Sequence, residues 1–339
     1  MALARQENEL RNNQLGEKIT RLPSPPKISV LIPCFRQTCF LEEALASVIR
    51  QNWQDMEIIV ADDASGDGAA LVVEAFQRRD SRIRFHGHPQ RLGLTANWNW
   101  CLREARGQTI KLMGGDDLLE APDCLSRQWA ALQRPGLALV SSARQLIDEA
   151  GEPIRIESTF SPGLHTGAAA RDRMLETQTN LVGEPVCALF WRKLSSRGFD
   201  PTYRQLNDME FWFHLLAQGD LLYQREPLVS FRIHPTQQSQ QNWSSGLSSE
   251  EHFRLLLQEA SKAYCGRRAR QAVALWTWSM LPNLPWSSAL NLMESAQRLR
   301  SQLGHIRFWF AATGHLLRRL AGRWGRSIRK RIGQRNARS

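Results

Sequence analysis

Two adjacent carboxylates, Asp116 and Asp117, follow an apolar run and two glycines in the segment IKLMGGDDLLE, residues 110–120. An aspartate can open a helix, because its side chain accepts hydrogen bonds from free amides of the first turn. That role accounts for one aspartate and hardly for both. Adjacent carboxylates on a rigid strand end can hold a hard divalent cation, which substrate phosphates commonly complete. The pair therefore indicates a metal–diphosphate site.

The elements that must position this pair alternate between buried strands and helices. Strand-like apolar runs are KISVLIP, MEIIVADD, IRFHGH and TIKLMGGDD, and segments with helical spacing separate them. This order predicts right-handed parallel crossovers, so roughly the first 125 residues should form a doubly wound α/β unit. Ligands gather at the carboxyl ends of such strands. Three features should meet there: residues 33–36, the pair Asp62 and Asp63, and the pair Asp116 and Asp117.

Several phosphate-binding classes lack their motif in this chain. No GxGxxG or GxxxxGK[ST] follows the first strand, which excludes the glycine-lined cradles of dinucleotide enzymes and P-loop NTPases. A phosphotransferase with an aspartate nucleophile needs that residue after the first strand, where this chain has IPCFRQ. If the ligand carries phosphate groups, their negative charge must be neutralised by something other than a glycine-rich loop.

The spaced motifs resemble family 2 glycosyltransferases of the GT-A fold. The resemblance is carried by ISVLIPCFRQTCFLEEALASVIRQNWQDMEIIVADDASGDG, LGLTANWNWCLREARGQTIKLMGGDDLL, NDMEFWFHLLAQG and EPLVSFRIHPTQQS, and covers about residues 27–240. It implies a Rossmann-like, mostly parallel central sheet flanked by helices. It also implies an inverting transferase that moves a sugar from a nucleotide-diphosphate donor (UDP-, GDP- or dTDP-sugar) to a hydroxyl of a glycan or lipid-linked glycan, in polysaccharide or cell-envelope biosynthesis.

The resemblance assigns donor contacts to the first two strand ends. Pro33 and Phe35 match positions that line the nucleotide base and sugar, although they can equally be a strand stop and a core aromatic residue. Asp63 matches the residue that hydrogen-bonds the base, a task that suits a carboxylate facing a ring N–H. Asp62 can instead support the turn.

Two asparagines in TANWNW, Asn97 and Asn99, are expected on a helix start near the same pocket. A side-chain amide both donates to and accepts from a base edge, and a helix cap is the alternative role for Asn97. The chain departs from the family pattern at Arg36, where Asn is frequent, and at residues 90–92, which replace a common Asn-x-Gly. These departures affect the fine donor contacts and leave the reaction class unchanged.

At the acidic pair, the resemblance implies that Asp116 contacts the donor ribose and that Asp117 ligates Mn²⁺ or Mg²⁺ on the diphosphate. His234 in FRIHP matches a position where a histidine completes the metal site, with a structural hydrogen bond as the alternative. A cation such as Arg232 would stabilise the charge of the leaving diphosphate.

The general base implied by the resemblance is Asp208, in the segment LNDMEFW that opens a later helix. It would take the acceptor proton while the acceptor oxygen attacks the anomeric carbon, so that one displacement inverts the configuration. Asn207 stands where the family commonly has an acid, and Glu210 is the reserve candidate. Aromatic residues on the acceptor side, mostly expected in the core, are Trp191, Phe211, Trp212 and Phe213.

Composition bounds the remaining possibilities. A chain of 339 residues with 42% apolar content can bury the core of one large or two modest domains. Six scattered cysteines without a CxxC pair fit a reducing compartment. Because neither an apolar signal-peptide region nor a run of about 20 apolar residues is present, we expect a cytoplasmic protein.

The net charge of +11 belongs to the C-terminal tail, since residues 295–339 hold 12 Lys or Arg and no acid. Trp309, Leu316, Leu320 and Trp324 share one helical face with arginines around them, which suits an anionic membrane surface at the inner face of the membrane. A solvated tail, a helix packed on the catalytic domain and a nucleic-acid site are alternatives. We expect no nucleic acid, because such a role gives no reason for the acidic strand ends.

The predicted organisation has four parts. A polar leader covers residues 1–26, the nucleotide-sugar half of the GT-A domain 27–125, the acceptor half 126–240, and a helical, basic extension 241–339. A catalytically silent nucleotide-sugar-binding protein remains the alternative to an enzyme.

Overall fold

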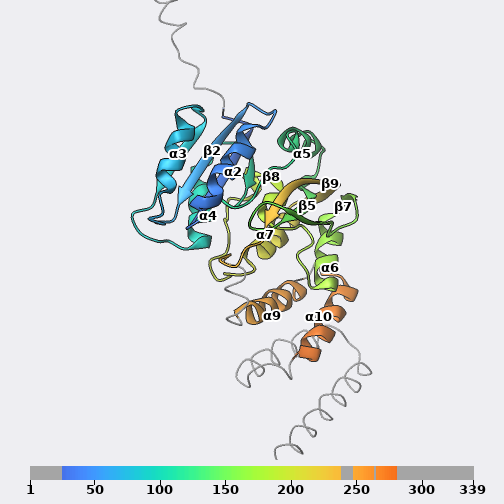
Figure 1. Ribbon diagram of the computed structural model, residues 1–339. Coiled ribbons are helices and arrows are strands. Elements are labelled where there is room, and N and C mark those ends of the chain that lie inside the picture. Colours follow the sequence, from blue (N-terminus) through green and yellow to red (C-terminus); the bar gives the residue numbers. More distant parts are fainter. Residues whose placement is uncertain (1–24, 238–246, 263–264, 281–339) are drawn as a thin grey trace, which may run out of the picture.

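The structure is a computed structural model, and it describes residues 25–237, 247–262 and 265–280 (Figure 1). The predicted leader therefore lies almost entirely outside the described residues, as does the basic segment 295–339. None of the helices in the described ranges has the length and hydropathy to cross a membrane.

A nine-stranded sheet with the order β3-β2-β1-β4-β8-β5-β9-β7 forms the centre of the molecule, and β6 pairs with β5 outside this path. The first four strands in the chain are parallel to one another: β1 (Ile28–Cys34), β2 (Met56–Asp62), β3 (Ile83–Gly87) and β4 (Thr109–Leu112). They form where the sequence predicts buried strands. The helices between them are α2 (Thr38–Ile49), α3 (Ala69–Gln77) and α4 (Leu94–Glu104).

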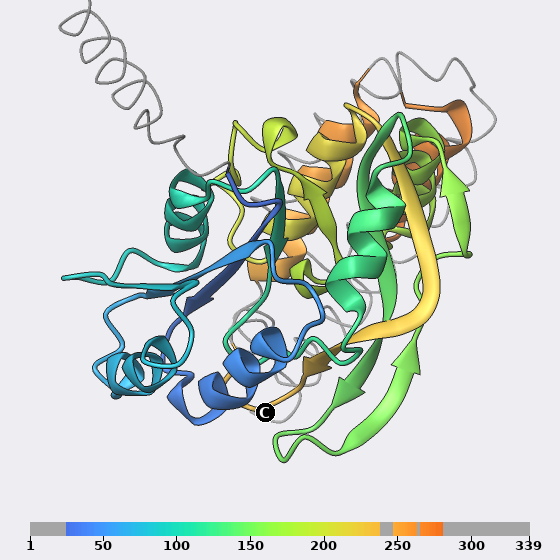
Figure 2. The ribbon, with the colours of Figure 1, turned by 90° about the horizontal axis from the view of Figure 1, so that it is seen from above.

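The second half of the domain continues the same sheet. After α5 (Cys124–Leu132), the long strands β5 (Leu137–Ile147) and β9 (Asp220–Arg232) lie parallel. The short strand β8 (Leu189–Trp191) runs antiparallel between β4 and β5 and joins the two halves. Figure 2 shows β9, in yellow, curving across one side of the molecule. The smaller elements are β6 (Pro153–Glu157), β7 (Gly163–His165), α6 (Gly167–Thr177), the 3-10 turns η1 (Pro185–Cys187) and η2 (Arg192–Leu194), and α7 (Asn207–Leu216).

Strands β1, β2 and β4 are buried on both faces, which explains their continuous apolar runs. Ile28, Val30 and Ile32 of β1 pack on one face with the α2 side chains, whereas Leu31 points into the opposite core. That opposite core holds Phe211, Trp212 and Phe213, as expected for residues of the core. It also receives apolar residues of α9 (Leu247–Ala260) and α10 (Arg267–Met280), so the described part of the C-terminal extension is helical and packs on the domain.

Candidate active site

The predicted strand ends meet at one edge of the sheet, which we call the carboxyl edge: the C-terminal ends of β1, β2 and β4. Cys34 pairs with Asp62, and the Met113 amide donates to the Leu31 carbonyl at 3.0 Å. Asp62 supports its own turn, because its carboxylate accepts hydrogen bonds from the backbone amide and the hydroxyl of Ser65. The topology thus brings residues 33–36, 62–63 and 116–117 to the same edge, as predicted.

Asp116 and Asp117 lie in a tight turn after β4. The next helix, α5, begins at Cys124, so the interpretation of this pair as a helix opening is wrong. The Gly114 amide donates to Asp117 Oδ2 at 3.1 Å. A Cβ at Gly114 would overlap Asp116 Oδ1, which explains the glycine at this position. Both carboxylates are buried, at 5% and 4% exposure.

The end of β9 holds this acidic turn from the other side. His234 Nε2 lies 2.9 Å from Asp116 Oδ2, and the Arg232 amide donates to Asp117 Oδ1 at 3.4 Å, a contact across 115 residues of sequence. The other ring nitrogen of His234 meets the Thr236 hydroxyl at 2.9 Å. The structure therefore brings together the three residues that the sequence assigns to ribose and metal.

Charge crowding marks this turn. Burial, together with the negative charges of Asp116 and Glu184, raises the pKa of Asp117 well above its ordinary value. A cation here would relieve both the desolvation and the repulsion. Two carboxylates and an imidazole are also suitable donors for Mn²⁺ or Mg²⁺. No three His, Cys, Asp or Glu side chains of the described residues surround a common point closely enough to form a complete metal group.

The Arg232 side chain is buried, and its donors are directed at the protein. It donates to the Asp116 carbonyl at 3.0 Å and to Glu43 Oε2 at 2.6 Å, and its Nη1 reaches the carbonyls of Asp148 and Glu149. This arrangement fixes the acidic turn. Arg232 thus has a clear positioning role, whereas direct contact with a leaving diphosphate requires some of these bonds to break.

Asp208 lies in the first turn of α7, where the sequence places the general base. Its Oδ2 accepts a hydrogen bond from Asn180 Nδ2 at 2.9 Å, and its Oδ1 accepts one from the Met209 amide at 2.6 Å. Burial, opposed by the Met209 hydrogen bond and reinforced by the charge of Glu184, raises the pKa of Asp208 to about 7. A carboxylate with this pKa is suited to proton transfer near neutral pH.

Glu210, the reserve base, is engaged elsewhere. Its carboxylate is buried and forms two 2.7 Å hydrogen bonds with the guanidinium of Arg197. Such a bidentate pair holds both side chains in place. The geometry therefore favours Asp208 over Glu210 as the proton acceptor.

The donor side of the carboxyl edge contains Pro33, Phe35 and Asp63. Pro33 is buried in β1, while Phe35 is partly exposed with the Arg91 guanidinium 3.9 Å from its ring centre. The Asp63 carboxylate accepts hydrogen bonds from the amides of Leu92 and Gly93 at 2.6 and 2.9 Å. Asp63 therefore anchors the loop that leads into α4. It also borders the position expected for the base of the donor nucleotide.

The amides of Asn97 and Asn99 are engaged within the protein. Asn97 lies inside α4, whose N-cap is Gly93, and it joins the Ala61 carbonyl to His88 Nε2, each at 3.0 Å. Asn99 pairs with both backbone groups of Phe199, at 2.9 and 2.7 Å. These contacts connect α4 to the rest of the domain and leave neither amide directed at the predicted donor pocket.

Two residues near the site, Asn180 and Glu184, escaped the sequence analysis. Asn180 is held by both backbone groups of Gly183 and positions Asp208. Glu184 pairs with Arg144 at 2.7 Å, and its charge raises the pKa of both Asp117 and Asp208. Because these residues lie in a segment without periodicity or a motif, no signal in the sequence singles them out. The negative charge of Glu184 thus acts on a residue of the acidic turn and on the candidate base, and raises the pKa of both.

Comparison with known proteins agrees with this geometry. The sequence model of Glycosyl transferase family 2 matches residues 29–199. An uncharacterized protein of Mycobacterium tuberculosis is 29% identical over 215 residues, which are 59% of this chain and 65% of that protein. The GalNAc(5)-diNAcBac-PP-undecaprenol beta-1,3-glucosyltransferase of Campylobacter jejuni is 38% identical over 95 residues, 28% of this chain and 31% of that protein. The chain thus spans less than two thirds of the length of either relative.

Solved structures share the fold at low identity. Residues 1–349 of TarS from S. aureus, in complex with UDP-GlcNAc, superpose with a TM-score of 0.62 at 15% identity, over 80% of this chain and 81% of that one. The mannosyltransferase PcManGT from Pyrobaculum calidifontis, in complex with GDP-Man and Mn²⁺, gives a TM-score of 0.50 at 17% identity, over 93% and 96% of the two chains. Since the family model covers half of the sequence and the sheet has the expected GT-A arrangement, the chain belongs to glycosyl transferase family 2.

Proposed function

We propose that the protein transfers a sugar from a nucleotide-diphosphate donor to a hydroxyl group of a glycan or lipid-linked glycan, with inversion at the anomeric carbon. The observation that carries this proposal is the buried acidic turn, Asp116 and Asp117, together with a half-buried Asp208 whose pKa is raised by burial to about 7. A structural role alone gives no reason to place both Asp117 and Asp208 within the electrostatic influence of a third carboxylate, Glu184.

In this mechanism Asp208 takes the proton of the acceptor hydroxyl. The acceptor oxygen forms its bond to the anomeric carbon while the bond from that carbon to the diphosphate oxygen breaks, and the electron pair leaves with the diphosphate. Asn180 holds one carboxylate oxygen of Asp208 at 2.9 Å, which orients the base. A single displacement from the face opposite the diphosphate inverts the configuration.

The acidic turn would hold a divalent cation, Mn²⁺ or Mg²⁺, through Asp117 and His234, with Asp116 toward the donor ribose. When bound, this cation supplies positive charge to the leaving diphosphate. The buried carboxylates, the raised pKa of Asp117 and the proximity of the His234 ring support the assignment. The Mn²⁺ complex of the mannosyltransferase PcManGT supports the same class of cofactor.

The donor nucleotide would bind between β1 and β2, against Pro33 and Phe35 and close to Asp63. The structural neighbours in complex with UDP-GlcNAc and GDP-Man support a nucleotide-sugar donor. Asn97 and Asn99 contribute indirectly in this proposal, because they fix the position of α4.

The proposed acceptor and location rest on the name of one relative and on the charge of the C-terminal segment. The Campylobacter relative is named for an undecaprenol diphosphate acceptor, which favours a lipid-linked glycan in cell-envelope synthesis. We retain the prediction that the basic segment 295–339 associates peripherally with an anionic membrane surface, and it lies outside the described residues.

The proposal is tested by calorimetry with UDP-, GDP- and dTDP-sugars, with and without Mn²⁺. We expect one class to bind more tightly with the metal. Asp117→Asn should abolish the metal-dependent gain, whereas Glu42→Gln, an exposed acid on α2, should leave it unchanged. Absence of binding for every nucleotide sugar in every metal condition would refute the transferase function. Metal-dependent binding without turnover on any acceptor would favour a silent binding protein.

A further inference from the structure

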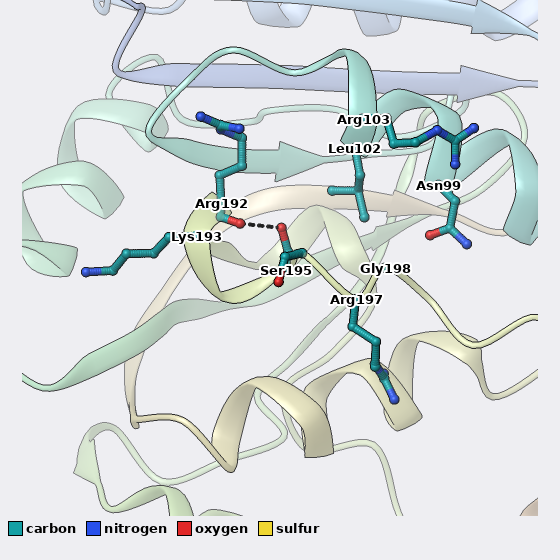
Figure 3. Close-up of a pocket in the computed structure, with 9 residues that line it drawn as sticks. Asn99, Leu102, Arg103, Arg192, Lys193, Ser195, Arg197 and Gly198 are labelled. Carbon is teal, nitrogen blue, oxygen red and sulfur yellow. Dashed lines mark hydrogen bonds between the residues drawn. The ribbon is translucent and has the colours of Figure 1, made fainter.

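A pocket of about 380 Å³ lies between α4 and the turn that follows β8 (Figure 3). Its basic lining residues are Arg103 on α4, Arg192 and Lys193 on η2, and Arg197 in the next turn. Ser195 and Ser196 add hydroxyl groups, and no acidic residue lines it. We call this feature the basic pocket. Its volume falls in the range typical of small-molecule sites.

The basic pocket lies at the opposite edge of the sheet from the candidate active site. The Arg192 amide donates to the Gln108 carbonyl at 3.0 Å, and Arg192 Nε donates to the Gly107 carbonyl at 2.6 Å. These carbonyls precede β4, whose first residue, Thr109, pairs with the first residue of β1, Ile28. The seven residues of β1 separate this edge from the carboxyl edge, a distance of about 20 Å at the rise of a strand. The basic pocket is therefore distinct from the donor and metal site.

Its positive charge is only partly compensated. Glu210 neutralises Arg197 through two hydrogen bonds of 2.7 Å. Arg103, Arg192 and Lys193 belong to none of the ion pairs within the described ranges, and all three are exposed. Three positive charges therefore border one hollow without a carboxylate partner. Repulsion between such neighbours is relieved when an anion binds.

The turn that forms this pocket is held in place before any ligand binds. The Ser195 hydroxyl and amide both donate to the Arg192 carbonyl, at 2.8 and 3.0 Å. Gly198 has a positive φ of 75°, and a Cβ there would lie 2.6 Å from Asn99 Oδ1. Asn99 in turn clamps Phe199 to α4. A preformed site loses less conformational entropy on binding than a flexible loop does.

The arrangement of the cations limits the ligand. Figure 3 shows Arg103, Arg192 and Arg197 on different sides of the pocket around Ser195. Several separated cations favour an anion that carries more than one negative charge. We propose that the basic pocket binds a phosphate-bearing polyanion, either a free oligophosphate or the headgroup of an anionic phospholipid with two phosphate groups. This site is independent of the sugar-transfer proposal.

The test uses the full-length protein without divalent metal, with EDTA present, to suppress binding at the acidic turn. Calorimetry measures the affinity for inorganic pyrophosphate, and co-sedimentation measures binding to phosphatidylcholine vesicles with and without cardiolipin. The pocket variant combines Arg103→Gln with Lys193→Gln, both exposed positions. The control combines Arg79→Gln with Arg225→Gln, which removes the same charge from exposed positions elsewhere. Thermal midpoints verify that both variants fold.

We expect the pocket variant to lose affinity about tenfold, equivalent to about 1.4 kcal/mol, and the control to bind as the wild type does. A loss seen with pyrophosphate identifies a free diphosphate as sufficient, and a loss seen only with cardiolipin vesicles identifies the lipid headgroup. If the wild type binds neither, or if both variants lose affinity equally, the proposed site is refuted. Equal losses would assign binding to overall charge, including that of the basic tail.

Discussion

Replacing Asp208 by asparagine should remove sugar transfer and, at the same time, make the folded protein less sensitive to alkaline pH. Burial raises the pKa of Asp208 from 3.8 to about 7, so the folded state prefers the protonated side chain. A group with a raised pKa contributes stability that is present below its unfolded pKa and is lost as the pH rises through the folded pKa. At neutral pH, ionisation of Asp208 therefore lowers the free energy of unfolding of the wild type, and the variant, which has no carboxyl group here, avoids this loss.

The size of this cost follows from the two pKa values of Asp208. Between pH 5 and pH 8, ionisation should lower the stability of the wild type by about 3 kcal/mol relative to Asp208→Asn, at about 1.4 kcal/mol per pKa unit. Asparagine has nearly the same size and shape as the protonated aspartic acid, so its side chain can still pack against Asn180. Transfer should fall by a factor of about 10² to 10⁴, the usual contribution of a general base, while donor binding persists.

Urea denaturation of both proteins at pH 5, 6.5 and 8 measures the predicted change, and a coupled assay of diphosphate release measures transfer. Glu42→Gln, an exposed acid on α2, serves as the control and should follow the wild type at every pH. A stability difference between Asp208→Asn and wild type that does not change with pH would show that this carboxyl does not titrate near 7. Unchanged transfer would remove Asp208 from the mechanism.

Three further predictions concern the acidic turn, the core and the tail. Gly114→Ala should displace Asp116 and abolish metal-dependent donor binding. The control Gly87→Ala should not, because the nearest atom to a Cβ at Gly87 lies 3.6 Å away. Calorimetry that finds metal-dependent donor binding in both variants would contradict this account. Phe211→Ala removes a fully buried ring stacked on Phe199 at 4.0 Å and should cost about 3 to 5 kcal/mol in urea denaturation; a loss below about 1 kcal/mol would show that the core refills. A chain ending at residue 294 should lose affinity for anionic liposomes, and retention of DNA binding without lipid binding by the full chain would reject the membrane role of the tail.

The sequence predicts the parallel half of the sheet well, because β1, β2 and β4 are buried on both faces and appear as continuous apolar runs. Right-handed crossovers then fix which strand ends share an edge. For that reason the order of strands and helices along the chain is enough to place the pairs 62–63 and 116–117 together. Asp208 at the start of α7 followed from the motif.

Long-range pairings could not be predicted. Asn99 is expected in the donor pocket, yet its amide contacts Phe199, 100 residues later, and lines the basic pocket. Asn97 is committed to Ala61 and His88 in the same way. A polar side chain near a predicted site can contact a ligand only when it is not already hydrogen-bonded to a backbone group elsewhere in the chain. The periodicity of the sequence carries no information about such distant partners. The short strand β8, which joins the halves, has only three residues and no alternating pattern.

The hydrogen bonds between the end of β9 and the acidic turn determine when this turn can be fixed during synthesis of the chain. Leu118 and Ser230 exchange two backbone hydrogen bonds, at 3.0 and 2.9 Å, and Arg232 and His234 complete the contact with the aspartates. During synthesis, the segments that contain the donor-side residues are therefore complete before β9, which holds the acidic turn in position, has been made. In the proposed mechanism the site is complete only once β9 has docked, so chains truncated before this strand would match the family model without a complete site.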